Sequence, residues 1–267
     1  HHVERDAVRR LFPGNKSPQL IEIRENATHL LIDCIMGDFS EPQHIRRFVV
    51  EWLDLDRDIR PFYLMLQQDP DLSDLAHQFR GFRMVGIPDL FEALVWCILG
   101  QQINLSFAYT LKRRLVERFG THIKFAKHNY FLFPEPSVLH HVSVQDLRSM
   151  QLTEKKAEYI KTITDLFYHQ QLSKDKLKAL GSEKKMLEEL IAIRGIGEWT
   201  ANYVLMKSLR AMNRVPYGDS GINGALFRLK QIPKKNNRRE VDKIFDQFEG
   251  WKTYLTFYLW RSNSKVL

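Results

Sequence analysis

A carboxylate and three aromatic residues in the C-terminal half of the sequence have the types and spacing that chemistry would need. Asp219 lies in the short loop PYGDS, directly before a segment of helical character. An aspartate in that position most often caps the following helix. A carboxylate held in place there also stabilises positive charge that develops during a reaction, so the sequence leaves both roles open for Asp219.

The aromatic residues are Trp199, Tyr203 and Trp260. Trp199 and Tyr203 are four positions apart, so they share one face of a helix. Packing in a core accounts for most tryptophans. Aromatic faces beside a carboxylate also suit an electron-poor or cationic ring, which binds by stacking and by cation–π attraction.

A double glycine precedes these aromatic residues in the stretch IRGIGEWTANY, where Gly195, Ile196 and Gly197 separate two helical segments. In such a turn the backbone N–H groups point outward, and with the positive end of the following helix they form an anion site. A hairpin of this kind grips a DNA phosphate without reading bases. A tight turn in which glycine only relieves strain explains the same pattern.

Two predicted regions position these residues. The apolar stretches Leu20–Ile23 and His29–Ile35 predict a β-hairpin, and EPQHIRRFVVEWLDL then has apolar residues at helical spacing. After Gly81 the pattern is almost purely helical. We therefore expect an α+β protein that is mostly α, with a small mixed domain over residues 1–80 and an all-α domain over residues 81–267.

Local signals place several helix ends in the second region. Asp89 and Glu92 have the spacing of a capping box, and Asn104 is expected to cap the next helix, which ends near Gly120. Asp219 is followed by a helix that is expected to start near Ser220.

Charge and composition narrow the function class. The 267 residues carry a net charge of +8, which favours a polyanionic partner such as nucleic acid. Basic clusters at 112–114 and 234–239 either contact phosphates or lie on a solvated face. No apolar run reaches the roughly 18 residues that cross a bilayer, so no membrane is expected. The two cysteines, Cys34 and Cys97, lack zinc spacing and cannot hold an iron–sulfur cluster, and a reducing cytoplasm is the expected setting.

Three segments in the correct order carry a resemblance to a known family. IRGIGEWTANYVLM followed by PYGDSGI resembles the hairpin and catalytic aspartate of the helix-hairpin-helix DNA glycosylase superfamily. FEALVWCILGQQINLSFAYTLKRRLVERFG resembles its helical segment with an I-L-G-Q-Q loop. FEGWKTYLTFYLWR resembles the closing helices of the bacterial 3-methyladenine DNA glycosylase II (alkylation-repair) family. The resemblance covers about residues 81–261 and implies a glycosylase domain after a small β-containing domain, which the chain enters partway.

The resemblance also implies roles for individual residues. Asp219 would be the catalytic residue, and the stretch from Gly195 to Gly197 would hold the phosphate. Trp199 stands where lyase-type members carry the lysine that forms a Schiff base, which implies a monofunctional enzyme. The pocket aromatics would be Trp199, Tyr203 and Trp260, and the wedge that replaces a flipped base would be Gln102 or Ile103.

The expected function is therefore a monofunctional glycosylase that flips and excises alkylated purines, such as 3-methyladenine and 7-methylguanine, from duplex DNA in bacterial base excision repair. It would act as a monomer in the bacterial cytoplasm, with nucleoid-associated activity and without a cofactor or catalytic metal. The resemblance implies a structural monovalent cation at the hairpin. Two alternatives stay open. One is a related glycosylase for deaminated, oxidised or mismatched bases, and the other is a non-catalytic DNA-binding module that uses the hairpin only to hold phosphates.

The sequence departs from the family pattern at the hairpin and beside the aspartate. Arg194 replaces a proline, and Glu198 stands where a basic residue is common, which places a negative charge close to the expected phosphate. Ser220 and Gly221 replace bulkier residues, so we expect a wider pocket.

Overall fold

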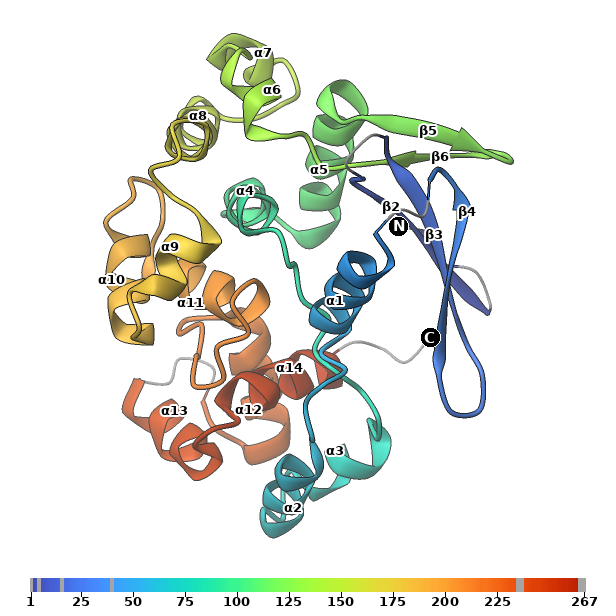
Figure 1. The fold of residues 1–267 in the computed structure, drawn as a ribbon. Helices are drawn as coiled ribbons and strands as arrows, with labels where there is room; N and C mark the ends of the chain where they lie inside the picture. Colours follow the sequence, from blue (N-terminus) through green and yellow to red (C-terminus); the bar gives the residue numbers. More distant parts are fainter. Residues whose placement is uncertain (1, 4–5, 15–16, 39–40, 234–237, 264–267) are drawn as a thin grey trace. The chain divides into compact units, whose positions relative to one another are not determined.

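A computed structural model describes residues 2–3, 6–14, 17–38, 41–233 and 238–263 (Figure 1). The described residues are mostly helical and contain two small sheets, which confirms the predicted fold class. The chain divides into two compact units, each built from two separate segments. Unit 1 comprises His1–Val49 and Val95–Leu172, and unit 2 comprises Val50–Leu94 and Ser173–Leu267. The boundary near residue 80 stays a prediction.

The larger sheet of unit 1 contains the β-hairpin that the sequence predicts. Its antiparallel strands are β1 (His2–Val3), β2 (Ala7–Phe12), β3 (Gln19–Glu25) and β4 (Leu30–Met36), in that order across the sheet. The turn between β3 and β4 is fixed by Asn26, whose side-chain oxygen accepts hydrogen bonds from the backbone N–H groups of Thr28 and His29, at 3.0 and 2.8 Å. Asparagine side chains stabilise turns in this way.

Two of the helices that follow the sheet begin at residues that the sequence predicts as caps. They are α1 (Pro42–Leu53), α4 (Leu90–Gly100), α5 (Leu105–Phe119), α6 (Pro136–His140), α7 (Val144–Arg148) and α8 (Glu154–Tyr168). The backbone N–H of Glu92 donates to Asp89 at 3.0 Å, and that of Phe107 donates to Asn104 at 2.8 Å. Both predicted caps are therefore confirmed.

The segment expected to be purely helical also contains a second sheet. The strands β5 (His122–Phe125) and β6 (His128–Phe131) form an antiparallel hairpin. Tyr130 is buried there and packs against Leu11 and Leu20 of the larger sheet. Four-residue strands give too short an alternation to stand out from their helical neighbours, and the burial of Tyr130 depends on a distant part of unit 1.

Unit 2 is built almost entirely from helices. These are α2 (Arg60–Gln68), α3 (Ser73–Gln78), α9 (Lys174–Ala179), α10 (Glu183–Ile191), α11 (Glu198–Lys207), α12 (Ser220–Lys230), α13 (Arg238–Phe245), the 3-10 turn η1 (Asp246–Phe248) and α14 (Lys252–Asn263). Phe62 of α2 is fully buried against Tyr254 and Tyr258 of α14, with ring centroids 5.6 and 4.9 Å apart. The hydroxyl of Tyr258 donates to backbone carbonyls, so this aromatic core leaves that group paired.

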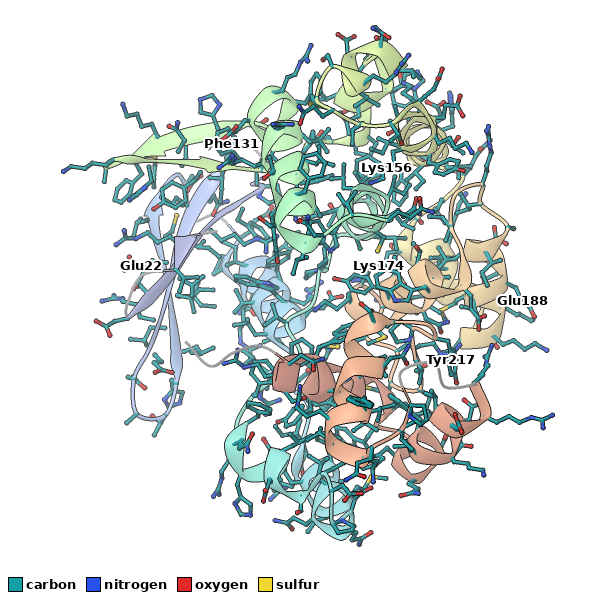
Figure 2. All side chains as sticks on the ribbon, turned by 180° about the vertical axis from the view of Figure 1, so that it is seen from behind. Glu22, Phe131, Lys156, Lys174, Glu188 and Tyr217 are labelled. Carbon is teal, nitrogen blue, oxygen red and sulfur yellow. The ribbon has the colours of Figure 1, made fainter. Side chains whose placement is uncertain are left out.

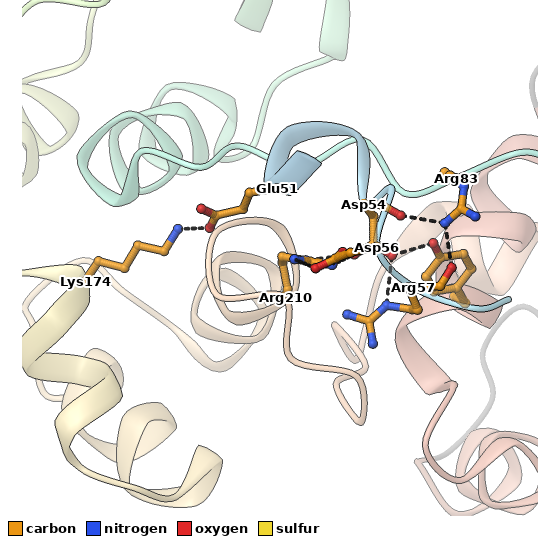
Figure 3. A network of polar contacts seen from close by, with 8 residues as sticks. Glu51, Asp54, Asp56, Arg57, Arg83, Lys174 and Arg210 are labelled. Carbon is orange, nitrogen blue, oxygen red and sulfur yellow. Dashed lines mark hydrogen bonds and ion pairs between the residues drawn. The ribbon is translucent and has the colours of Figure 1, made fainter. Parts of the chain in front are cut away.

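A buried carboxylate joins the connection before α2 to the connection after α11 (Figure 3). Asp54 is fully buried and accepts hydrogen bonds from Arg57 Nε at 2.8 Å, Arg210 Nε at 2.7 Å and the Tyr254 hydroxyl at 2.6 Å. Burial opposes ionisation of Asp54, but the hydrogen bonds from Arg57 and Tyr254 and the positive charge outweigh it and lower the pKa of this carboxyl. Arg83 completes the network by donating to the carbonyl of Asp54.

The connection from α11 to Asp219 is held at several further points. The carbonyl of Lys207 accepts a 2.7 Å hydrogen bond from Ile87 N–H, and the carbonyl of Ala211 accepts one of 2.7 Å from the buried hydroxyl of Thr253. The side-chain oxygen of Asn213 accepts from Gly250 N–H at 2.6 Å. Asp219 is therefore presented by a loop whose backbone groups are anchored inside unit 2.

Candidate active site

Asp219 caps the helix that follows it. It is the N-cap residue of α12, and its Oδ1 accepts a 2.9 Å hydrogen bond from the backbone N–H of Ile222. The capping role that the sequence left open is therefore confirmed. This bond fixes the carboxylate at the positive end of α12.

Two indole N–H groups also hold the same carboxylate. Trp260 of α14 donates from Nε1 to Oδ1 at 2.8 Å, and Trp199 of α11 donates from Nε1 to Oδ2 at 3.1 Å. Both carboxylate oxygens are thus oriented by neutral donors from two different helices. These hydrogen bonds fix the orientation of the carboxylate, and electrostatic catalysis requires such preorganised groups.

The three predicted aromatic residues meet beside Asp219. The rings of Trp199 and Tyr203 are stacked, with centroids 5.2 Å apart and an interplanar angle of 19°. Tyr203 and Trp260 are 5.9 Å apart at 41°. All three side chains are half-buried rather than part of the closed core. The structure therefore combines a fixed carboxylate with partly accessible aromatic faces, which suits the binding of a planar cationic ring.

Gly221 makes this arrangement possible, although the sequence suggested only that it widens the pocket. A Cβ atom on Gly221 would lie 2.9 Å from Cδ1 of Trp260 and 3.0 Å from Oδ1 of Asp219. The space that the small residue leaves, which was expected to widen the pocket, is instead occupied by the indole of Trp260. The signal in the sequence was a glycine in the first turn of a helix, where glycine has no propensity advantage.

The hairpin combines a glycine in the left-handed region with the N-terminus of a helix. Gly195 has φ of +96°, in the left-handed region that other residues rarely adopt, while Ile196 is buried and anchors the turn. Gly197 is the N-cap of α11 and offers no side-chain oxygen to the first N–H groups of the helix. Those N–H groups face an exposed glycine, where an external acceptor would reach them.

Glu198 is paired with a cation beside this hairpin. Its Oε1 lies 2.9 Å from Nη1 of Arg238, the first residue of α13. The negative charge that was expected to oppose a phosphate is therefore partly balanced. Residues 234–237 of the basic 234–239 cluster lie outside the described residues.

Gln102 and Ile103 belong to unit 1 and are described within it. Gln102 is exposed with a left-handed φ of +57°, and Ile103 is half-buried. Nearby, the buried ammonium of Lys156 (Figure 2) donates a 2.9 Å hydrogen bond to the carbonyl of Leu99 in the last turn of α4, and burial lowers the pKa of this lysine. The loop after α4 therefore starts from a fixed helix end.

Two of the three basic side chains at 112–114 make contacts within the protein. Lys112 lies over the ring of Trp96, with Nζ 5.4 Å from the centroid. Arg114 donates to the carbonyl of Met150 at 3.2 Å and to the side chain of Gln151. Only Arg113, with 68% of its side chain exposed, is mainly a surface cation.

In the described part of the chain, no group of three or more His, Cys, Asp or Glu side chains is arranged to hold a metal ion. Neither Cys34 nor Cys97 forms a disulfide bond in the described part of the chain. None of the helices in the described ranges is long and apolar enough to cross a membrane.

The helical hairpin and the carboxylate at the start of α12 define a class of protein, and comparisons with known proteins agree. A family model described as "HhH-GPD superfamily base excision DNA repair protein" matches residues 95–249. A second one, described as "8-oxoguanine DNA glycosylase, N-terminal domain", matches residues 5–94. The chain belongs to the HhH-GPD superfamily of base excision DNA repair proteins.

Individual relatives extend this likeness over the whole chain. The DNA-3-methyladenine glycosylase of Bacillus subtilis is 43% identical over 267 residues, which cover 98% of this chain and 88% of that protein. The solved 3-methyladenine DNA-glycosylase from Archaeoglobus fulgidus has a TM-score of 0.84 at 26% identity, over 99% of this chain and 90% of that chain. A Clostridium acetobutylicum 8-oxoguanine glycosylase/lyase in complex with double-stranded DNA has the same fold, with a TM-score of 0.77 at 19% identity over 97% of each chain.

Proposed function

We propose that the protein is a monofunctional DNA glycosylase that flips alkylated purines of the 3-methyladenine and 7-methylguanine type out of duplex DNA and excises them. One observation carries the proposal: Asp219 is held between the indole N–H groups of Trp199 and Trp260, beside the stacked ring of Tyr203. The name and 43% identity of the Bacillus subtilis relative support the substrate class.

The aromatic faces provide the basis for substrate selection. Alkylation at a ring nitrogen gives the purine a positive charge, which strengthens its stacking and cation–π attraction to tryptophan and tyrosine. The same charge weakens the glycosidic bond, since the base leaves as a neutral molecule. The site therefore needs no strong general acid. In the described residues, the donors to Asp219 are two indoles and a backbone N–H, which is consistent with such substrates.

The chemistry then falls to the carboxylate. The bond between C1′ and the base nitrogen breaks, and its electron pair leaves with the base. The sugar gains oxocarbenium character, which the Asp219 carboxylate stabilises by its charge. A water molecule adds to C1′ and releases one proton to solvent, which completes the hydrolysis. Asp219 Oδ2, which accepts one hydrogen bond from the described residues, would orient that water.

We further propose that the enzyme has no lyase activity. Strand cleavage by a glycosylase requires an amine that forms a Schiff base with the sugar. Among the described residues, the side chains that donate hydrogen bonds to Asp219 are the indoles of Trp199 and Trp260, which cannot form one. The hairpin from Gly195 to Gly197 would hold a DNA phosphate, with a monovalent cation as a structural element, and Gln102 or Ile103 would fill the gap left by the flipped base. The enzyme would act as a monomer without a catalytic cofactor.

The decisive experiment measures base release from duplex DNA treated with a methylating agent. We expect free 3-methyladenine or 7-methylguanine with wild type and none with Asp219→Asn, with strand breaks appearing only after alkali. Asp89→Asn is the matched control, because Asp89 also caps a helix with a side-chain hydrogen bond. If Asp219→Asn releases bases at the wild-type rate, the assignment of Asp219 is wrong.

A second candidate function is the removal of oxidised purines, which the match of residues 5–94 to the 8-oxoguanine glycosylase N-terminal domain favours. A duplex with one 8-oxoguanine distinguishes the two. If wild type releases 8-oxoguanine but does not release alkylated bases, the substrate is an oxidised purine and the alkylpurine assignment is wrong. Tight DNA binding without any release would favour the non-catalytic module.

A further inference from the structure

Arg238 occupies a position between the hairpin and the loop that carries Asp219. Its Nη1 lies 2.9 Å from the carboxylate of Glu198, the first residue of α11. Its guanidinium carbon lies 3.9 Å from the ring centroid of Tyr217, which is two residues before Asp219. One cation of α13 therefore contacts both parts of the proposed DNA-binding site.

The aromatic contact gives this arginine a defined position. The hydroxyl of Tyr217 donates a 2.5 Å hydrogen bond to Asp242 of α13, so the ring below the guanidinium is itself fixed. Burial and the neighbouring carboxylate raise the pKa of Tyr217 to about 12, and the ring stays neutral at physiological pH. Figure 2 labels Tyr217 in unit 2.

The ion pair with Glu198 holds the arginine only weakly. The Arg238 and Glu198 side chains are 57% and 42% exposed, and such pairs contribute at most about 1 kcal/mol to stability. A guanidinium has five N–H donors, more than one carboxylate oxygen can accept. Glu198 is the first residue of α11, where the helix N-terminus attracts an anion, so a phosphate arriving there would compete with its carboxylate.

We propose that Arg238 binds a DNA phosphate beside the hairpin. In the free protein Glu198 and Tyr217 hold its guanidinium in position, and on DNA binding the guanidinium exchanges Glu198 for a phosphate. The hairpin supplies backbone N–H groups, and Arg238 supplies a positive charge that Glu198 partly balances in the free protein. This inference rests on the proposed function, since it assumes that duplex DNA lies across the hairpin.

The test is the salt dependence of binding to a short duplex that carries one tetrahydrofuran abasic-site analogue. Each phosphate contact contributes about 0.9 to the slope of log affinity against log salt concentration. We expect Arg238→Gln to lower affinity about tenfold at low salt, as for a charge-assisted hydrogen bond, and to reduce the slope by about 0.9. Glu198→Gln should raise affinity, because it removes a negative charge beside the phosphate.

The double variant separates phosphate binding from simple neutralisation of Glu198. If Arg238 binds phosphate, Arg238→Gln lowers affinity and slope in the Glu198→Gln background as well. If Arg238 only neutralises Glu198, Arg238→Gln changes neither affinity nor slope in the Glu198→Gln background, and the proposal is overturned. Arg60→Gln is the control, since Arg60 is another exposed arginine of unit 2 paired with an exposed acid, Asp58.

The two possible failures are distinguishable. If wild type does not bind the duplex and releases no base, the proposed function is wrong. If wild type binds with a strong salt dependence that Arg238→Gln leaves unchanged, only the role of Arg238 is wrong. Thermal unfolding of each variant shows whether a loss of affinity reflects a loss of folded protein.

Discussion

The indole of Trp260 and the carboxylate of Asp219 are joined by a 2.8 Å hydrogen bond between two helices, although the residues are 41 positions apart in the chain. Gly221 lies next to both groups, and a Cβ atom there would collide with the indole. The geometry of the candidate catalytic residue therefore depends on a glycine that takes no part in the chemistry.

Gly221→Ala should displace the Trp260 ring and lower the rate of base release. The added Cβ would lie 2.9 Å from Trp260 Cδ1, which forces either the indole or the helix to shift. Overpacking of this kind costs about 1–3 kcal/mol of stability. Single-turnover base release and tryptophan fluorescence measure the two consequences.

Gly224→Ala is the matched control in the same helix. Its Cβ would meet only Asn263 Oδ1 at 3.9 Å, an ordinary contact. A helical glycine replaced by alanine normally gains about 0.5–1 kcal/mol, so this variant should be at least as stable as wild type and fully active. Equal activity of both variants would mean that the position of Trp260 does not limit the rate.

Gly197→Ala should weaken DNA binding without unfolding the protein. Gly197 has φ of −89°, and nothing lies within 4 Å of the position of its Cβ, so alanine fits the free protein. The methyl group would project where a phosphate approaches the N–H groups of α11. The check is duplex affinity at fixed salt together with the thermal midpoint of unfolding.

Gly195→Ala provides the contrast within the same hairpin. Gly195 has φ of +96°, so alanine would strain the backbone by about 1–3 kcal/mol. This variant should lose stability as well as affinity. If Gly197→Ala binds duplex DNA as tightly as wild type, the hairpin is not part of the DNA-binding site.

Borohydride reduction during the reaction should trap no covalent protein–DNA complex with wild type. Trapping requires an imine between a lysine and the sugar, and Trp199 and Trp260 are the side chains in contact with Asp219. Trp199→Lys would place an amine there and is expected to give a trapped complex if it folds. A trapped complex with wild type would instead show that another amine reaches the sugar.

Asp54→Asn should destabilise unit 2 by about 3 kcal/mol at neutral pH, because Arg57 and Arg210 lose the buried charge that compensates them. The pKa of Asp54 is lower in the folded protein than its ordinary value near 3.9, so its stabilising contribution is full above that pH. It is lost as the pH falls through the lower folded-state pKa.

Urea unfolding at neutral and acidic pH tests this dependence. Asp58→Asn is the control, since Asp58 makes an exposed pair with Arg60 and should have little effect on stability. The gap between wild type and Asp54→Asn should narrow as the pH falls. A gap that is the same at every pH would show that the ionisation of Asp54 contributes nothing.

The sequence predicted the parts of the site that depend on local chain geometry. The caps at Asn104 and Asp219 and the shared face of Trp199 and Tyr203 each follow from residues within a few positions. The convergence of Trp260 was indicated only through the resemblance. Its hydrogen bond to Asp219 was not predicted, because no periodicity relates positions on different helices.

The missed features are all long-range. Arg210 and Asp54 are 156 positions apart, and their pairing requires the complete packing of unit 2. Glu198 and Arg238 pair across two helices, and no local sequence pattern indicated this contact. Short strands such as β5 and β6 were missed because burial of Tyr130, rather than local propensity, stabilises them.

The division of unit 2 into two segments has a consequence for synthesis of the protein. Phe62 leaves the ribosome long before Tyr254 and Tyr258, the residues that bury it. The aromatic face of α2 therefore stays uncovered while residues 95–172 of unit 1 and the part of unit 2 before α14 are translated. The same late helix, α14, delivers Trp260 to Asp219. Completion of the core and assembly of the candidate active site are thus one event, and a nascent chain that stops before α14 would be both aggregation-prone and inactive.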